Sequence, residues 1–222
     1  MKKNLFICFG LFAALSLCAC DKNETPTPTP EDNFQGLVLA KAEPERGFSF
    51  RVGSSETTIH LHVSPDQNYV DKDYKDWEKS MQPHCDKMYE QLLANGWSAN
   101  SYGYPYAMLK SIKLTADVDV AGIPAGEELI QLFELDIPIE FQPIFTYNDL
   151  NLALNLKVEE YKNGEYWPVA KFDSVEEFIN GEYLMVKGIY LTPKAGVSIP
   201  EGVTYTATVT LSTGASQTAT SK

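Results

Sequence analysis

Short segments of the chain alternate apolar and polar residues with the two-residue period of β-strands. In the segment 57–64, Ile59, Leu61 and Val63 alternate with polar residues, so we expect one buried face. Runs rich in β-branched and aromatic residues, bounded by turn residues, predict further strands at 36–41, 47–52, 109–120, 137–146, 150–161, 166–172, 183–192 and 203–212. Many short strands favour two packed sheets, and we expect a mainly β, immunoglobulin-like antiparallel β-sandwich.

A helical insertion interrupts these strands at about residues 68–96. Its apolar residues fall on one stripe of a helix, namely Val70, Tyr74, Trp77, Met81, Cys85, Met88 and Leu92. Pro83 is expected to divide the insertion into two helices, and Gly96 to end the second. Shorter helical pieces are predicted at 126–133 and 174–180, the latter opening with a capping box of Ser174 and Glu177.

The beginning of the chain follows a different pattern. Lys2 and Lys3 precede an apolar run at 5–17. This run is shorter than the roughly 20 residues that a transmembrane helix needs, and it is typical of a signal peptide. Cleavage requires a small residue beside the cut, which favours a cut after Ala19 over one after Leu17.

The residues Leu17-Cys18-Ala19-Cys20 resemble the lipobox of bacterial lipoproteins, with Cys18 where Ala or Ser is usual. This resemblance implies that Cys20 carries a diacylglycerol thioether and an N-acyl chain, which together give lasting membrane attachment. The alternative is an ordinary secretory signal that leaves an unmodified cysteine.

The segment after Cys20 is predicted to be a stalk. Residues 21–32 contain three Thr-Pro pairs, four acidic residues and no aliphatic residue, a composition that favours an extended, unpacked chain. Asp21 and Glu24 resemble sorting signals of lipoproteins at the surface of some Gram-negative gut anaerobes, whereas an Asp there in enteric bacteria implies inner-membrane retention. We predict an outer-membrane lipoprotein, on the surface or the periplasmic face.

Three parts of the chain follow from these patterns. Residues 1–19 are the predicted lipoprotein signal peptide, residues 20–33 the lipidated cysteine and stalk, and residues 34–222 a single β-rich domain with the helical insertion. Within that domain, the stretch 111–133 resembles the middle of lipoproteins of unknown function from gut anaerobes, and this resemblance implies no site.

The net charge and the missing motifs disfavour several classes of partner and of enzyme. The net charge of −12 disfavours nucleic acid and anionic lipid as partners. The nucleophile elbow, the zinc-protease helix, the P-loop and the dinucleotide fingerprint are all missing from the sequence. We therefore expect a non-catalytic binding or interaction module without a cofactor, held to the membrane by its lipid and contacting a glycan or an envelope protein. The alternatives are a glycan-binding lipoprotein and an envelope hydrolase that uses two carboxylates.

An aromatic loop is the main candidate for ligand binding. Trp97, Tyr102, Tyr104 and Tyr106 lie among Gly, Ser and Asn residues, and flat rings with a polar tip suit stacking on sugars. The alternation at 102, 104 and 106 also fits the start of a strand whose rings cover the helical insertion.

His60 and His62 could bind a metal ion, because they project from one face of a strand. His84 or Cys85 would have to complete the site, since two ligands are too few. The alternative is a pair of exposed or helix-covered histidines on the polar side of that strand.

Two further residues have a chemical and a structural interpretation. Cys85 is the one cysteine left after signal removal and acylation of Cys20, and its place on the apolar stripe predicts a buried thiol rather than a nucleophile. Asp173-Ser174-Val175 resembles a sequence that is O-glycosylated in envelope proteins of some gut anaerobes. The alternative role of Ser174 is that of a helix cap.

Overall fold

A computed structural model describes residues 37–43, 48–55, 58–65, 72–97, 102–140, 142–160 and 167–221. All of them belong to one compact unit, Gln35–Lys222. The predicted signal peptide, Cys20 and the stalk lie outside the described residues, as does Val70 of the apolar stripe.

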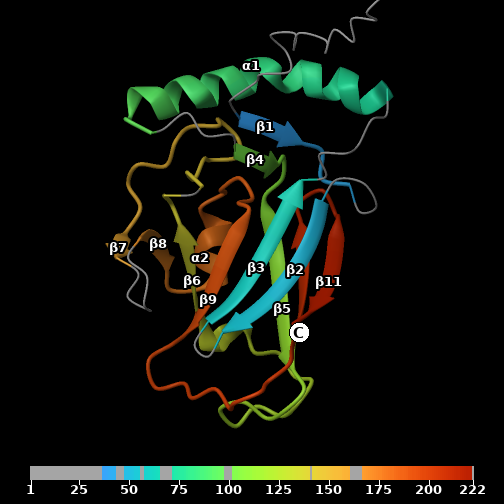
Figure 1. The fold of residues 1–222 in the computed structure, drawn as a ribbon, viewed down its shortest axis with the longest axis vertical. Helices are drawn as coiled ribbons and strands as arrows, with labels where there is room; N and C mark the ends of the chain where they lie inside the picture. Colours follow the sequence, from blue (N-terminus) through green and yellow to red (C-terminus); the bar gives the residue numbers. More distant parts are fainter. Residues whose placement is uncertain are drawn as a thin grey trace, which may run out of the picture. The chain divides into compact units, whose positions relative to one another are not determined.

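Six strands form the larger sheet (Figure 1). In spatial order they are β2 (Phe48–Ser55), β3 (Thr58–Pro65), β9 (Gly188–Pro193), β6 (Phe133–Pro138), β8 (Pro168–Phe172) and β7 (Val158–Glu160). Every neighbouring pair is antiparallel. The predicted alternation holds on β3, where Ile59, Leu61 and Val63 are buried and His60 and His62 are exposed.

Three strands form the smaller sheet, in the order β11 (Ser216–Thr220), β10 (Tyr205–Leu211) and β5 (Leu109–Ala116), again antiparallel. The alternate residues Tyr205, Ala207, Val209 and Leu211 of β10 are buried. The strand 203–212 is therefore confirmed, with its polar residues on the outer side.

The two sheets pack face to face. The ring of Phe133 on β6 lies edge-on to that of Tyr205 on β10, with 6.5 Å between centroids. Figure 1 shows β5 passing behind β2 and β3. The chain is thus mainly β, with two antiparallel sheets in a sandwich-like arrangement, as the alternation predicts.

One helix, α1 (Lys72–Ala94), lies over a parallel pair of short strands, β1 (Leu37–Ala40) and β4 (Tyr102–Pro105) (Figure 1). The predicted break at Pro83 is wrong, since this residue lies inside α1. Proline removes a single backbone donor there, while the buried stripe continues on both sides of it through Met81, Cys85, Met88 and Leu92. Gly96, with φ of 78°, ends the helix as predicted.

Several predicted boundaries are wrong in the middle of the chain. The strand expected at 137–146 lies instead at Phe133–Pro138, and only a 3₁₀ turn, η2 (Ile130–Leu132), forms within the helix expected at 126–133. Pro138 and Pro143 lack the backbone donors that a longer strand needs. Likewise, of the described residues 150–160, only the three of β7 form a strand. Strand β9 begins at Gly188 rather than near 183.

Candidate functional site

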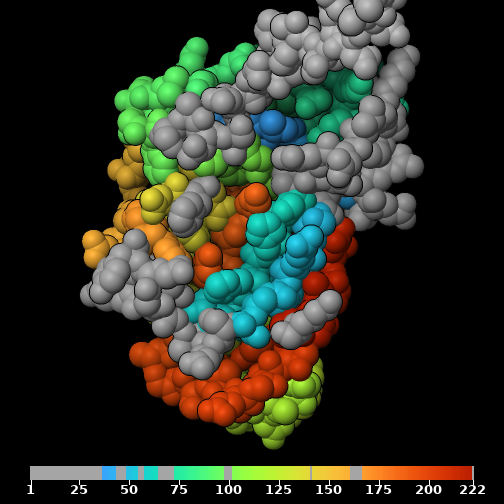
Figure 2. All heavy atoms as spheres, in the orientation of Figure 1, coloured from blue at the N-terminus to red at the C-terminus, as the bar shows by residue number. Residues whose placement is uncertain are grey.

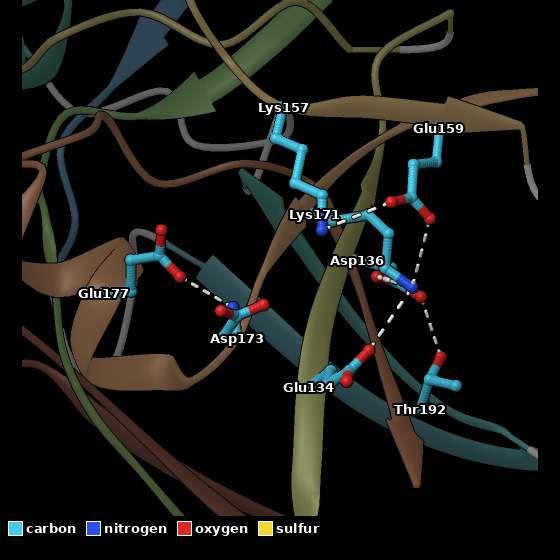
Figure 3. Close-up of polar contacts among 8 residues, drawn as sticks. All are labelled: Glu134, Asp136, Lys157, Glu159, Lys171, Asp173, Glu177 and Thr192. Atoms are coloured by element: carbon cyan, nitrogen blue, oxygen red, sulfur yellow. Dashed lines mark hydrogen bonds and ion pairs between the residues drawn. The ribbon is translucent and has the colours of Figure 1, made fainter. Parts of the chain in front are cut away.

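A group of charged residues lies on the outer side of the six-stranded sheet (Figure 3). Phe133, Leu135 and Ile137 of β6 are buried, so the intervening Glu134 and Asp136 point to the other side. The pairing register sets Asp136 opposite Lys171 of β8. The Lys171 cluster comprises Lys171, Glu134, Asp136, Glu159 and Thr192.

Lys171 is shared by three carboxylates. Its Nζ lies 3.3 Å from Glu134 Oε2, 3.6 Å from Asp136 Oδ1 and 4.0 Å from Glu159 Oε2. Thr192 Oγ1 donates a hydrogen bond of 2.9 Å to the second oxygen of Asp136. The cluster thus links side chains from β6, β7, β8 and β9.

Asp136 is the buried member of this cluster, with 1% of its surface exposed. Burial raises the pKa of its carboxyl, and this effect outweighs the opposing effects of Thr192 and Lys171. Burial alone would lower the pKa of Lys171, but the carboxylates, Asp136 foremost, raise it overall. In the folded protein, the charge of each group therefore stabilises the charge of the other.

The geometry of the Lys171 cluster indicates a structural role. A glycosidase needs two carboxyl groups on either side of a bound sugar, about 5–9.5 Å apart with room between them. Here a lysine lies between the carboxylates, and Asp136 is closed off from solvent. The cluster accordingly provides no argument for hydrolysis, and its contacts tie neighbouring strands together.

The aromatic loop is divided by the fold. Tyr102 and Tyr104 are 6% and 1% exposed. Tyr104 donates a hydrogen bond of 2.7 Å to the carbonyl of Pro143 and lies edge-on to Phe145. Burial raises its pKa well above the usual value. These two rings cannot stack on a ligand, and both residues lie in β4, so the strand of the alternative interpretation is confirmed.

Trp97 and Tyr106, the other two rings of that loop, are half-buried against the core. Tyr106 belongs to a different row of rings. Its centroid lies 5.1 Å from that of Tyr147 and 6.3 Å from that of Trp77 on α1. Burial first, and then Tyr147, raises the pKa of Tyr106. Together Trp77, Tyr106 and Tyr147 form the aromatic row.

Sequence reasoning placed Trp77 in the apolar stripe and did not consider Tyr147. The backbone brings Tyr147 to this place because its N–H bonds the carbonyl of Glu182, while Lys87 of α1 bonds the carbonyl of Asp149. These are contacts between distant segments, so no local pattern in the sequence could have indicated the aromatic row.

The two histidines have separate neighbours in the fold. His60 packs against Tyr190, with 4.2 Å between ring centroids, and His62 Nε2 lies 2.8 Å from Ser64 Oγ. Burial, then Lys187 and Arg51, lowers the pKa of His62. Over the described part of the chain, no three His, Cys, Asp or Glu side chains are placed to hold a metal ion.

Cys85 and Ser174 both have structural roles. Cys85 is 3% exposed, and burial raises the pKa of its thiol, so it stays protonated in the core as the apolar stripe predicts. Ser174 caps α2 (Val175–Asn180) by accepting a hydrogen bond of 3.2 Å from the N–H of Glu177. The carboxylate of Glu177 accepts one of 2.6 Å from the N–H of Asp173, the residue before the cap, so the Ser174 half of the predicted capping box is confirmed. Glycosylation of Ser174 stays a prediction.

Among the described residues, no helix is long and apolar enough to cross a lipid bilayer. Comparisons of the chain with protein-family models, with curated proteins and with solved structures give no match.

Proposed function

We propose that this protein is a lipid-anchored lipoprotein of the cell envelope whose β domain is a non-catalytic binding or interaction module. The observation that carries the proposal is Cys20 at the end of a lipobox-like sequence, directly after an apolar run and directly before a Thr-Pro stalk. Attachment at the outer membrane, on its surface or its periplasmic face, is part of the proposal.

The interaction role is supported by the structural roles of the groups that could otherwise react. The thiol of Cys85 is in the core, the hydroxyl of Ser174 caps a helix, and the carboxylates beside Lys171 hold strands together. What the domain offers to a partner is therefore its surfaces. We also propose an immunoglobulin-like arrangement, which the two facing antiparallel sheets support and to which the parallel β1–β4 pair is an addition.

A glycan-binding lipoprotein is the second candidate. The aromatic row favours it, because three half-buried rings from separate segments lie together, and such rings can stack on sugars. Loss of binding to a soluble xylan in Tyr106→Leu, with binding kept in Tyr89→Leu on α1, would support this site. Tryptophan fluorescence of the full chain in mild detergent is a suitable readout.

Palmitate labelling tests the anchor. Cells that express the full chain are grown with radioactive palmitate, alongside the variants Cys20→Ser and Cys18→Ser. We expect label on the wild type and on Cys18→Ser, and none on Cys20→Ser, which should also leave the membrane fraction. An unlabelled wild type, or equal label on both variants, would contradict the proposed attachment at Cys20.

A further inference from the structure

The outer side of the three-stranded sheet presents hydroxyl groups at eight of the nine positions that the pairing register aligns in rows. These positions are Ser111, Lys113 and Thr115 on β5, Thr206, Thr208 and Thr210 on β10, and Ser216, Thr218 and Thr220 on β11. The pairing register aligns them in rows that cross the sheet, with one residue from each strand. Together they form the hydroxyl face.

Within each row, the residues of β10 and β11 bond each other through their hydroxyls. The oxygens are 3.0 Å apart in Thr206–Thr220, 2.8 Å in Thr208–Thr218 and 3.1 Å in Thr210–Ser216, and either partner can be the donor. A hydroxyl has one donor and two acceptor positions. Each pair therefore keeps a donor and acceptors for a ligand, and can reverse its direction to suit it.

The hydroxyl face is accessible to solvent. Ser216, Thr218 and Thr220 on β11 are exposed, and so are Ser111 and Lys113 on β5. Lys113 is the one charged residue among these nine positions, and the exposed Lys110 lies beside them on β5, in a chain with a net charge of −12. Such a face suits a neutral, hydroxyl-rich ligand, since an anionic polymer would meet the negative charge of the whole chain.

The size of the hydroxyl face limits its partners. Strands about 4.8 Å apart and a rise of about 3.4 Å per residue give a patch of roughly 10 by 14 Å. A stable protein complex buries about 800 Å² on each side, so this patch alone is too small for a second copy of the chain. An extended polymer chain needs less contact at each site, because many anchored copies can bind it together.

We propose that the hydroxyl face binds a neutral polysaccharide, whose hydroxyls exchange hydrogen bonds with the threonine pairs. This inference rests on the glycan-binding candidate and gives it a surface other than the aromatic row. Of the three strands of the hydroxyl face, the sequence pattern predicts β5 and β10, at 109–120 and 203–212, and does not predict β11.

The test is native affinity electrophoresis of the full chain in mild non-ionic detergent, in gels that contain hydroxyethylcellulose, xyloglucan or polygalacturonate. The variant Thr208→Val/Thr218→Val removes one hydroxyl pair and keeps the branched shape. Ser49→Ala/Ser54→Ala, at exposed positions of β2, is the matched control. Losing two neutral hydrogen bonds should weaken retardation by a neutral polymer about tenfold, while the control stays at the wild-type value.

Each other outcome overturns the inference. Retardation that persists in the valine variant but is lost in Tyr106→Leu places the glycan on the aromatic row, and the second candidate function survives. If no neutral polymer retards the wild type, the hydroxyl-face inference and the glycan-binding candidate are both wrong. The lipid anchor is tested separately by palmitate labelling. Retardation by polygalacturonate alone, lost in Lys113→Gln, shows a charge effect, and a wild-type dimer that the valine variant dissociates shows a protein interface.

Discussion

The outer sides of the two sheets differ, although the same alternation builds both. On the six-stranded sheet, the outward Asp136 is almost fully buried, and its carboxylate contacts Lys171 and Thr192. On the three-stranded sheet, the outward residues are short, mostly uncharged, and exposed on β11. Polar residues on the outer side of a sheet can thus be buried and ion-paired, or short and accessible to solvent.

The difference follows from side-chain length and charge. Long side chains of opposite charge converge and can cover a shorter neighbour, which must then be paired inside the protein. Threonine side chains are too short to cover one another, and they satisfy their hydroxyls in pairs while staying accessible. A buried charge therefore indicates a role in stability, and an accessible neutral array indicates a role in contact.

The largest expected effect comes from removing the shared cation of the Lys171 cluster. Lys171→Met leaves Asp136 buried without its ion pair, so we expect the free energy of unfolding to fall by about 2–4 kcal/mol. Urea unfolding of the full chain, followed by tryptophan fluorescence, measures this change.

A matched control lies next to the same sheet, just before β7. Lys157 lies 3.2 Å from Glu159, but both side chains are at least half exposed. Lys157→Met should therefore cost less than about 1 kcal/mol. The double variant Lys171→Met/Asp136→Asn should recover part of the loss, because no buried charge remains. Equal effects of the two lysine variants would contradict the distinction between buried and exposed charge.

The second effect is a dependence of folding stability on pH, and it has opposite signs for Asp136 and for Asp117. The pKa of Asp136 is raised by burial, so its contribution to stability is complete below its unfolded pKa and is lost as the pH rises through the folded one. Asp117, after β5, accepts a hydrogen bond of 2.8 Å from the N–H of Thr204, which lowers its pKa. Its contribution is present above its unfolded pKa and is lost as the pH falls.

Asparagine variants separate these contributions. At neutral pH, Asp136→Asn should change the free energy of unfolding by no more than about 1 kcal/mol, since the amide keeps an acceptor for Thr192. It should also remove the decline in stability as the pH rises from acid values. Asp117→Asn should instead reduce the loss of stability on acidification. Urea midpoints measured between pH 3 and pH 8 give both slopes, and slopes of the same sign would refute the assignment.

Local patterns in the sequence predict much of this fold. Alternation locates β3 and β10, the apolar stripe places Cys85 in the core, and Ser174 with Glu177 predicts the start of α2. These features depend on residues close together in the chain. The continuity of α1 through Pro83 depends instead on packing against β1, which a local rule for proline does not include.

The Lys171 cluster depends on contacts between distant parts of the chain. In the sequence, Asp136 is an ordinary polar residue of a strand. Only the pairing of β6 with β8 places Lys171 beside it. Figure 2 shows β2 and β3 lying side by side on one face of the domain, a pairing that adjacent strands in the sequence do suggest. The partners of β6, in contrast, come from later in the chain, and the sequence alone does not determine them.

The smallest expected effect on stability is that of the hydroxyl face. In Thr208→Val/Thr218→Val, both partners of one hydrogen bond are replaced by apolar groups of the same shape, so no buried polar group is left unpaired. Valine also favours strands as threonine does. We therefore expect the urea midpoint to give a free energy of unfolding within about 0.5 kcal/mol of the wild type. A single substitution, Thr208→Val, should behave alike, because Thr218 is exposed and can bond water instead. A loss above about 1 kcal/mol would mean that the threonine pairs stabilise the sheet as the Lys171 cluster does, and the contrast between the two outer sides would fail.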